Sequence, residues 1–559
     1  MGQHDGASRA LKQARRCAFF LLGALLVPST SNAAAFPAAT GERFAVATDS
    51  ADATRAAVDA LEHGGNAADA AVAAALALGV VAPAGSGLGG GGFALVYLKK
   101  TEKVVAIDFR EYAPREVDTA YLMTRTEPAA KDGRAVGLPG EPFGLEALTR
   151  SYGKRSLRSN AEYAIRLARS GFVVSSHTRK AYADIGARLE VGGELQHALA
   201  SGSKVIQRAD LAKTLETYGD GGARALFAGD TGARIESSLW SHHASLKREE
   251  LTNYVVRQSQ PMQWDALGLR WATMPMPSAG GLMLRQVSMS AEAWSDKLLN
   301  AGMGSSGYIH ALSELFRGAL LDRAMFASDP SARPLPASVF DAEKLRVRRD
   351  AYDENRTTPL RAPTPREGGT THLVVVDAEG NAVTLTTTVN SPFGSGIEVP
   401  GTGLLMNDEL YDFSTRAEEE ALGIKSPGPN APAPGMRPVS SMTPAFAWKD
   451  GQLKLAIGGS GGPRIATGVA QTALCIVLLR RDAGDCVAAS RTHLGWDNTV
   501  FVDEDAPGDV KEGLLRRGES VRATPNGSAV QAVVIENKTG KIQLKAASDP
   551  RKRGLAVAR

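Results

Sequence analysis

Cysteine is scarce in this chain, with three residues in 559. Cys17 lies in an apolar N-terminal segment, and the other two are Cys475 and Cys486. An oxidising compartment would allow these two to pair, but Cys475 lies in the apolar stretch TALCIVLL, which is typical of a buried segment. We therefore favour two separate core cysteines over a disulfide. Cysteine spacings typical of structural zinc are absent, and the nine histidines form no HExxH pattern, so no metal site is predicted.

A strong charge of one sign is also lacking. The formal net charge is +4, but residues 1–35 hold four basic side chains against one aspartate, so the rest carries only about +1. No basic surplus remains to indicate a nucleic-acid partner. Apolar residues make up 43% of the chain and charged residues 22%, which is typical of a soluble globular protein with a sizeable core.

Long apolar runs are few, and the first lies near the N-terminus. Arg15 and Arg16 precede the run CAFFLLGALLVP (17–28), and the small residues of SNAAA follow, ending at position 35. A basic segment, a short apolar run and small residues are the three parts of a secretory signal. The run is too short to span a bilayer comfortably. We therefore expect residues 1–35 to be a cleavable signal peptide, and the mature protein to be periplasmic or secreted without a stable membrane anchor.

A glycine-rich stretch, SGLGGGGFALVYL (86–98), has the composition of a phosphate-binding loop but not its context. Such loops lead from a strand into a helix, whereas this one leads into the strand pattern FALVYL. We interpret the glycines as sites of close backbone approach within a packed sheet. Before them, residues 53–83 predict two helices broken at Gly64-Gly65. After them, VVAIDFRE (104–111) predicts a strand with Arg110 at its end.

The chain changes in character near residue 370. Residues 140–270 show mainly the three- and four-residue apolar spacing of helices. The Pro-rich, charged segment 330–367 predicts an exposed, mobile stretch that suits cleavage. Strand patterns dominate thereafter, GLLMNDEL (403–410) among them, with one helical pattern at 466–481. Periodicity alone therefore predicts an α+β fold.

The segment TTHLVVVDAEGNAVTLTTT (370–388) predicts a β-hairpin. Two β-branched runs flank AEGN, in which Gly380 can take positive φ and Asn381 tolerates it. Thr370 begins the first strand directly after the flexible Gly368-Gly369. A threonine held at that point could act as a nucleophile, but threonine is common in strands, so this residue alone decides nothing.

Further polar signals follow the hairpin, and each one alone is explained equally well as a cap, a turn or a surface charge. They are Thr388 and Asn390 in the second strand, Glu409 and Asp412 in NDELYDFS, Arg437, Ser440 and Ser441 in RPVSSM, and Gly461 and Gly462 in GGSGGPR.

Together these signals belong to a longer ordered set. It runs through HGGNAADAA, SGLGGGGF, DFRE, LPG (138–140), MPMPSAGG, TTH, TLTTTVN, NDELYDFS, RPVSSM, SGGPR and SDPR. From Arg43 to Arg551 the chain resembles the γ-glutamyltransferases (γ-glutamyltranspeptidases), which are N-terminal nucleophile hydrolases. The resemblance implies a four-layer αββα sandwich with two mainly antiparallel central sheets.

The resemblance also implies that the precursor cuts itself between Gly369 and Thr370. A large subunit (36–369) and a small subunit (370–559) would then form a heterodimer and share the one αββα domain. A freed Thr370 carries an α-amine with a pKa of about 7.7–8.0, which can activate its own hydroxyl. Gly369 admits the strained backbone that an acyl shift from nitrogen to oxygen needs.

The remaining roles follow from the same resemblance. Arg110, Ser440 and Ser441 would hold the substrate α-carboxylate, and Asn390, Glu409 and Asp412 would surround its α-ammonium. Backbone N–H groups of Gly461 and Gly462 would stabilise the oxyanion, and Thr388 would hydrogen-bond the nucleophile. Glutathione or another γ-glutamyl compound would acylate Thr370, and water or an amino-acid or peptide acceptor would take the acyl group. The resemblance implies no metal and no organic cofactor.

Two segments depart from the family pattern. Residues 415–436 match the length of a loop that covers the pocket but lack its tyrosine, so the balance of transfer and hydrolysis stays open. Residues 490–505 lack the usual Pro-Arg-rich pattern. The alternatives are a cephalosporin (glutaryl) acylase, a poly-γ-glutamate hydrolase or transpeptidase, and a γ-glutamyl-binding protein that never cuts itself.

Overall fold

The computed structural model describes residues 36–126, 130–244, 246–358, 368–525, 527–538 and 540–559. The chain divides into a unit Met1–Phe36 and a unit Pro37–Arg559, and the fold below is that of the second unit. The predicted signal peptide, residues 1–35, lies outside the described residues. Within the described part, no helix has the length and apolar content needed to cross a bilayer.

Two seven-stranded sheets, each with antiparallel neighbours throughout, form the middle of this unit. The first has the order β21 (Leu555–Ala558), β2 (Ala45–Thr48), β10 (Gly369–Val376), β11 (Ala382–Asn390), β3 (Gly91–Leu98), β4 (Lys103–Phe109) and β7 (Arg257–Ser259). The second has the order β1 (Ala39–Gly41), β20 (Lys541–Ser548), β19 (Ala529–Lys538), β15 (Gln452–Ser460), β14 (Ala445–Lys449), β9 (Leu269–Thr273) and β8 (Met262–Ala266). Each sheet therefore combines strands from before and after the Gly369–Thr370 bond.

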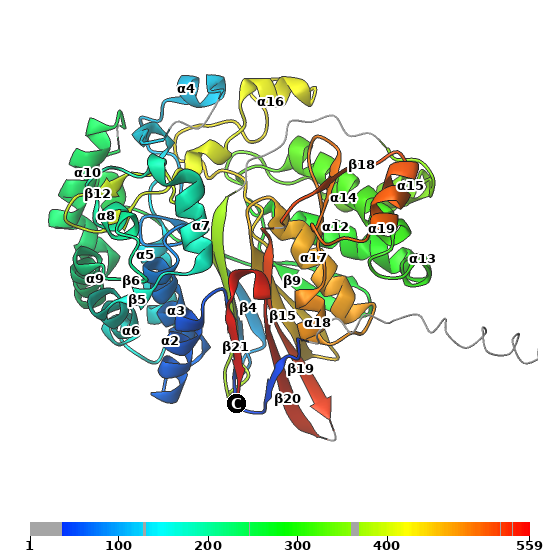
Figure 1. The fold of residues 1–559 in the computed structure, drawn as a ribbon, viewed down its shortest axis with the longest axis horizontal. Helices are drawn as coiled ribbons and strands as arrows, with labels where there is room; N and C mark the ends of the chain where they lie inside the picture. The colour runs from blue at the N-terminus through cyan, green and yellow to red at the C-terminus, as the bar shows by residue number, and fades with distance from the viewer. Residues whose placement is uncertain (1–35, 127–129, 245, 359–367, 526, 539) are drawn as a thin grey trace, which may run out of the picture. The chain divides into compact units, whose positions relative to one another are not determined.

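Helices cover the outer face of each sheet, as Figure 1 shows on either side of the central strands. The first sheet is covered by α2 (Ala51–Glu62), α3 (Ala67–Val81) and α5 (Glu141–Tyr152), and α6 (Leu157–Ser170) and α9 (Ala209–Ala228) pack on these helices. The second is covered by α12 (Ala279–Ala293), α14 (Ser306–Phe326), α17 (Arg464–Val477) and α18 (Ala483–Ala488). Since β10 and β11 pack against β15, the layers run helix, sheet, sheet, helix, which confirms the αββα prediction.

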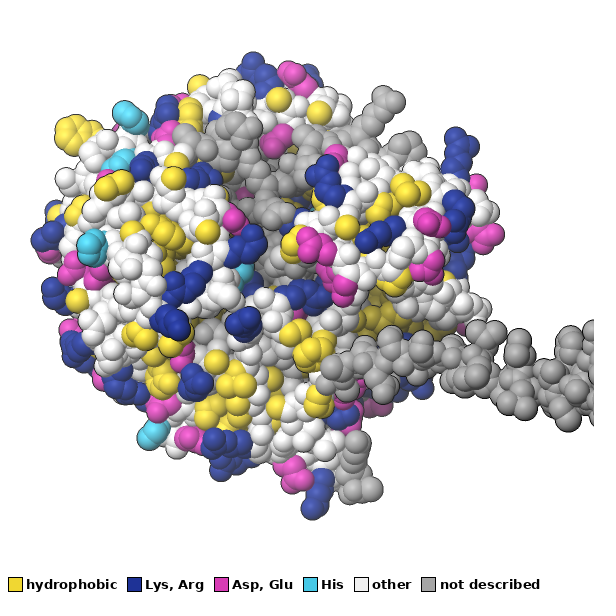
Figure 2. All heavy atoms as spheres, viewed as in Figure 1, with side chains coloured by type: hydrophobic (Ala, Val, Ile, Leu, Met, Phe, Trp, Pro, Cys, Tyr) yellow, Lys and Arg dark blue, Asp and Glu magenta, His cyan; other side chains and the backbone are white. Residues whose placement is uncertain are grey.

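The remaining elements are short. They are α4 (Thr119–Thr124), α7 (Ser176–Ile185), α8 (Glu194–Ala200), α10 (Asp230–Ser241), α11 (Arg248–Thr252), α13 (Ser295–Ala301), α15 (Ala342–Asp350), α16 (Arg416–Ala421), α19 (Gly508–Arg516), β5 (Phe172–Val173), β6 (Val205–Ile206), β12 (Glu398–Val399), β13 (Leu404–Leu405), β16 (Thr492–Leu494), β17 (Thr499–Val502) and β18 (Ser520–Ala523). On the face shown in Figure 2, basic and acidic side chains are intermixed, as the small net charge leads one to expect.

The predicted hairpin is confirmed and forms the centre of the first sheet. β10 pairs with β11 antiparallel, and Gly380 in the turn has φ +81°. The carboxylate of Asp377 accepts the backbone N–H of Asn381 at 2.9 Å, which closes the turn. Thr370 lies opposite Thr388, and the register is irregular between Gly369 and Thr370. The hairpin therefore brings two of the predicted site residues face to face.

Three segment predictions were wrong in part. Residues 140–270 were expected to be mainly helical, but the end of this segment forms β7, β8 and the start of β9, and Gly268 (φ +68°) lies in the turn between β8 and β9. In GLLMNDEL only Leu404–Leu405 is strand, because the Asn407 side chain donates to the carbonyls of Gly89 and Gly137 and draws the chain out of the ladder. In the segment expected to be mobile, 342–350 forms α15, while 359–367 lies outside the described residues.

The prediction of two separate core cysteines was wrong. Cys475 in α17 and Cys486 in α18 form a disulfide, with their Cα atoms 5.6 Å apart. The chain turns back after α17, so α18 packs against it and brings the second cysteine to the first. Sequence spacing could not show this, because an apolar environment suits a thiol and a disulfide equally.

Removal of this disulfide by Cys475→Ser with Cys486→Ser is expected to lower the free energy of unfolding by about 2–3 kcal/mol, because the bond closes a short loop. The measurement is thermal unfolding of both proteins with and without a reductant. The reductant should lower the wild-type midpoint towards that of the variant and leave the variant unchanged. Equal midpoints under oxidising conditions would contradict a stabilising disulfide.

Candidate active site

A cavity of about 160 Å³ gathers most of the predicted site residues. Those that line it are Arg110, Thr370, Thr388, Asn390, Glu409, Asp412, Ser440, Ser441 and Gly462. Gly369 and Gly461 are not in the lining but adjoin residues that are. These residues come from the position directly after β4, both hairpin strands, a short 3-10 helix (Glu409–Asp412) and two loops, so only the packed fold brings them together.

Thr370 lies at the start of β10 and is buried, with 4% of its surface exposed. Its Oγ1 is 3.4 Å from Thr388 Oγ1. The Thr388 hydroxyl donates to the carbonyl oxygen of Gly369 at 2.7 Å. That carbonyl belongs to the peptide bond that joins Gly369 to Thr370. A donor on this oxygen stabilises the negative charge that develops when a nucleophile attacks the carbonyl carbon.

Glycines let other backbone segments pass close to this strand. A Cβ at Gly369 would lie 2.1 Å from the carbonyl oxygen of Ala84, so no larger residue fits there. In the glycine-rich stretch, a Cβ at Gly90 would lie 2.0 Å from the carbonyl oxygen of Thr388. This confirms close backbone approach as the reason for the glycines. The glycine-rich stretch therefore packs directly against the strand that carries Thr388.

A lysine that the sequence analysis missed holds the main chain of Thr370. Lys552 Nζ donates to the Thr370 carbonyl oxygen at 2.5 Å and to Ser460 Oγ at 2.7 Å, and it pairs with Asp49 Oδ2 at 3.1 Å. The Lys552 side chain is only 8% exposed. The only available signal was its position directly after SDPR, and nothing local connects that motif to the hairpin.

Arg110 lies directly after β4 and forms a buried cluster with acidic side chains. Its guanidinium donates to Glu409, to Asp412 Oδ2 at 2.6 Å, and through Nε to the Pro438 carbonyl at 3.3 Å. Burial raises the pKa of Glu409 well above its usual range, although the charge of Arg110 acts in the opposite direction. Burial likewise raises the pKa of Glu111 to about 7, again opposed by Arg110. Glu409 and Asp412 therefore share one guanidinium, with the carboxyl of Glu111, unpaired among the described residues, close to it in the chain, and the cluster can accommodate a further cation.

A second arginine of the sequence motifs supports this cluster. Arg437 pairs with Asp108 at 2.8 Å, and Asp108 in turn accepts the backbone N–H of Arg110 at 2.9 Å. Arg437 therefore contacts Arg110 through Asp108, and it does not line the cavity. It positions the end of β4, from which the Arg110 side chain enters.

The serines and glycines lie on other walls of the cavity. Ser440 is buried, and its Oγ accepts the backbone N–H of Met442 at 3.2 Å. Gly461 and Gly462 have φ +123° and +58°, in the region that favours glycine. They precede α17, and backbone N–H groups at a helix start attract negative charge. This arrangement suits the predicted oxyanion role, whereas Ser440 and Ser441 suit a carboxylate.

The loop 415–436 contributes to the cavity wall. It contains α16 and supplies Leu422, Ile424 and Pro429 to the lining. Although this loop has no tyrosine, Tyr411 just before it also lines the cavity, and its hydroxyl lies 2.8 Å from that of Tyr121.

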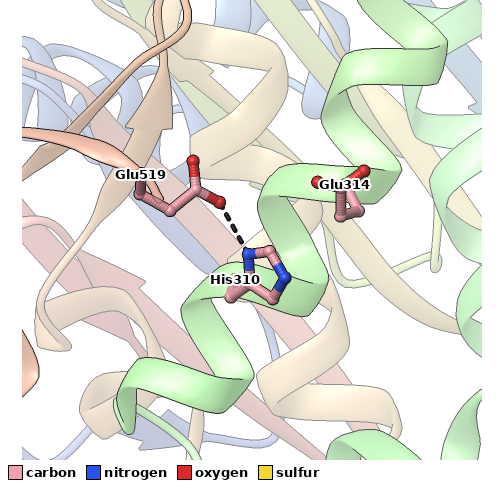
Figure 3. Close-up of side chains that lie close together, drawn as sticks. All are labelled: His310, Glu314 and Glu519. Carbon is pink, nitrogen blue, oxygen red and sulfur yellow. Dashed lines mark hydrogen bonds and ion pairs between the residues drawn. The ribbon is translucent and has the colours of Figure 1, made fainter. Parts of the chain in front are cut away.

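One cluster of His310, Glu314 and Glu519 has the composition of a metal site (Figure 3). Its atoms are already engaged: His310 Nδ1 lies 2.7 Å from Glu519 Oε1, and His310 Nε2 lies 2.9 Å from the Asp353 carbonyl. Arg317 pairs with both glutamates. A resident cation would repel this guanidinium, so the residues fit a structural ion-pair cluster and do not fit a metal site.

Comparisons with known proteins agree with this geometry. The sequence profile of the family described as Gamma-glutamyltranspeptidase matches residues 53–559. The chain is 33% identical over 554 residues to the glutathione hydrolase proenzyme of Pseudomonas aeruginosa, covering 96% of this chain and 98% of that protein. It is 31% identical over 528 residues to the glutathione hydrolase proenzyme of Escherichia coli, covering 90% of each.

Among solved structures, the cephalosporin acylase from Bacillus halodurans has a TM-score of 0.81 and 23% identity to this chain, and covers 95% of this chain and 98% of its own. At that identity the likeness shows the αββα fold alone. The profile match and the two relatives cover nearly the whole described unit, and this chain belongs to the γ-glutamyltranspeptidase family.

Proposed function

We propose that this protein is a self-processing γ-glutamyltransferase that cleaves γ-glutamyl amides such as glutathione. One observation carries the proposal. The hydroxyl of Thr370 and the guanidinium–carboxylate cluster of Arg110, Glu409 and Asp412 line the same cavity. A γ-glutamyl group has an amino-acid head with both charges and a carbonyl carbon farther along the chain, so it matches both features at once.

Maturation would begin with attack of Thr370 Oγ1 on the carbonyl carbon of Gly369. The C–N bond breaks, an ester forms, and the threonine nitrogen gains the proton that the hydroxyl loses. This shift already frees the α-amine of Thr370, and water then hydrolyses the ester to release the Gly369 carboxylate and regenerate the Thr370 hydroxyl. The hydrogen bond from Thr388 to the Gly369 carbonyl supports this step. The products would be residues 36–369 and 370–559 as a heterodimer, after removal of a signal peptide (1–35) in a periplasmic or secreted protein.

Substrate recognition would use the charges of the cluster at both ends of the amino-acid head. Arg110 with Ser440 and Ser441 would bind the α-carboxylate, because a guanidinium fork matches a carboxylate. Asn390, Glu409 and Asp412 would surround the α-ammonium, which supplies the cation that the acidic cluster can accommodate. Such a head group would place the side-chain amide carbonyl towards Thr370.

Catalysis would then proceed by acyl transfer. The freed amine of Thr370 takes the hydroxyl proton while Oγ1 attacks the γ-carbonyl, and the backbone N–H groups of Gly461 and Gly462 stabilise the oxyanion. The leaving amine takes a proton and departs, leaving a γ-glutamyl ester. Water gives glutamate, whereas an amino-acid or peptide amine gives a new γ-glutamyl amide.

An acylase for glutaryl side chains is the second candidate, and the fold fits it equally. A glutaryl group lacks the α-ammonium, however, and would supply no second cation to Glu409 and Asp412 beside Arg110. The buried acidic cluster therefore favours the γ-glutamyl donor over the glutaryl one.

The test of the proposed function uses the exported full-length protein. Intact mass and N-terminal sequencing should show two chains, the smaller beginning Thr370-Thr371-His372. Incubation with glutathione should release cysteinylglycine, and addition of glycylglycine should yield its γ-glutamyl derivative. A single uncut chain that stays uncut on incubation would contradict the enzyme proposal and favour a γ-glutamyl-binding protein. Preference for a glutaryl amide over its γ-glutamyl analogue would favour the acylase.

Lys552 offers a separate prediction for a positioning residue. Lys552→Met is expected to lower kcat about tenfold with little change in KM, because the ammonium contacts the main chain of Thr370 and not the cavity. Lys552→Arg should recover part of the loss. Exposed Arg553 is a matched control, and Arg553→Met should behave as wild type. A raised KM with unchanged kcat would contradict the positioning role.

A further inference from the structure

The cavity contains a second arginine that the proposed mechanism does not use. Arg323 lies in the last turn of α14 and lines the cavity beside Trp496. Its guanidinium carbon is 5.5 Å from the centre of the Trp496 ring. Among the described residues, the Arg323 side chain has no hydrogen-bond or ion-pair partner, and its Nε is buried. A guanidinium in this position is available to an anion that enters the cavity.

Trp496 provides a second unused donor at the same wall. It is 4% exposed, and its indole Nε1 is buried without a hydrogen-bond partner among the described residues. Buried polar groups in folded proteins are nearly always paired, so an unpaired N–H calls for an acceptor from outside the chain. Two such donors side by side indicate a ligand group that accepts hydrogen bonds and carries negative charge.

Arg323 forms no ion pair with the acidic residues of the amino-acid head site among the described residues, although it lies within reach of their charges. Asp412 is bonded to Arg110 at 2.6 Å and influences Arg323 only at longer range. Burial lowers the pKa of Arg323, and the charge of Arg110 acts in the same direction. An added carboxylate at the cavity wall would give the Arg323 guanidinium the direct anionic partner that it lacks among the described residues. Leu422, Ile424 and Ile465 line the same cavity and offer apolar contacts to a side chain attached to that carboxylate.

We propose that Arg323 and Trp496 form a leaving-group subsite for the free carboxylate of the amino acid or dipeptide attached to the γ-glutamyl group. This inference rests on the proposed function, since it presumes that such a donor acylates Thr370. The planar guanidinium matches a carboxylate, and the indole ring supports the guanidinium face. An acceptor amine enters where the leaving amine departed, so the same subsite selects amino-acid and peptide acceptors that keep a free carboxylate.

The test compares two donors that differ in one group. γ-Glutamylglycine has the leaving-group carboxylate, and γ-glutamylmethylamide lacks it. For the mature wild-type enzyme, kcat/KM should be higher for γ-glutamylglycine. In Arg323→Met, the ratio of the two kcat/KM values should fall about tenfold or more, through KM for γ-glutamylglycine. Arg323→Lys should lose less, because it keeps the charge.

A matched control is present elsewhere on the chain. Arg285 also lies over an aromatic ring, 3.8 Å from the centre of Phe340, but it does not line the cavity. Arg285→Met should leave the ratio as in wild type. If Arg323→Met does not fold, Trp496→Phe keeps the ring, removes the N–H and should lower the same ratio a few-fold.

The outcomes separate the inference from the proposed function. A wild-type enzyme that cleaves both donors, with an unchanged ratio in Arg323→Met, overturns the subsite and leaves the function standing. An equal loss for both donors also overturns it, because the arginine would then serve the head group or the fold. A wild-type protein that cuts itself but cleaves neither donor overturns the proposed function instead.

Discussion

Thr370→Ala is expected to leave the exported protein as one uncut chain without γ-glutamyl hydrolase activity. The substitution removes Thr370 Oγ1. This atom would attack the Gly369 carbonyl during self-cleavage and would later accept the γ-glutamyl group. Loss of both steps should reduce turnover to the background of the assay, a loss of several orders of magnitude. The measurements are denaturing electrophoresis over several days and cysteinylglycine release from glutathione.

Thr370→Ser is the conservative control, because it keeps the hydroxyl and the future α-amine. It should still cut itself and retain part of the turnover. Thr371→Ala controls for removal of a neighbouring hydroxyl, since Thr371 is buried but does not line the cavity. Normal processing of Thr370→Ala would refute self-cleavage by this residue and would show that another group is the nucleophile.

Arg110→Met is expected to lower kcat/KM for a γ-glutamyl anilide roughly a hundredfold or more, because charge-assisted hydrogen bonds to the α-carboxylate are lost. The substitution also leaves Glu409 buried without its cation, a situation that costs about 3–5 kcal/mol of stability. The thermal midpoint should therefore fall, and the double variant Arg110→Met, Glu409→Gln should regain part of the stability but not the activity. Kinetics and thermal unfolding of both variants separate the two effects.

A donor without the α-carboxylate tests the same assignment from the substrate side. The wild-type enzyme should cleave a 4-aminobutyryl anilide poorly, and Arg110→Met should lose far less with this donor than with the γ-glutamyl anilide. Arg134 is a control arginine, because it pairs with Asp132 outside the cavity. An equal loss of Arg110→Met with both donors would show that the arginine acts on the fold and not on the carboxylate.

The hairpin and two nearby elements show how much of the fold can be predicted from the sequence. The β-branched runs around AEGN, the break at Gly64-Gly65 and the helical pattern at 466–481 all have local causes. The structure confirms the first two, and it confirms the third as far as the end of α17 at Val477. The wrong predictions involve elements whose state is set by partners far along the chain. Residues 257–273 became strands because two sheet edges were available to pair with them.

The candidate site divides in the same way. The ordered motifs named Arg110, Glu409 and Asp412, but only the structure shows that Arg110 already pairs with both acids. Lys552 could not be found from sequence, because the atoms that give it a role lie 182 residues away on Thr370. In the sequence, Arg323 likewise has no feature that distinguishes it from other helical arginines, and only the fold shows that it lines the cavity.

The sequence by itself determined the local pieces of this protein: the hairpin, the alanine-rich helix, the glycines at close approaches and the motifs that identify the family. Each depends on backbone preferences or on residue types within a few positions, which the chain carries wherever it folds. The tertiary structure alone decided the disulfide, the sheet edges, the Lys552 contact and the unpaired Arg323–Trp496 wall. Those depend on which distant segments meet in the packed sandwich, and burial then determines which charges are paired and which stay available to a substrate.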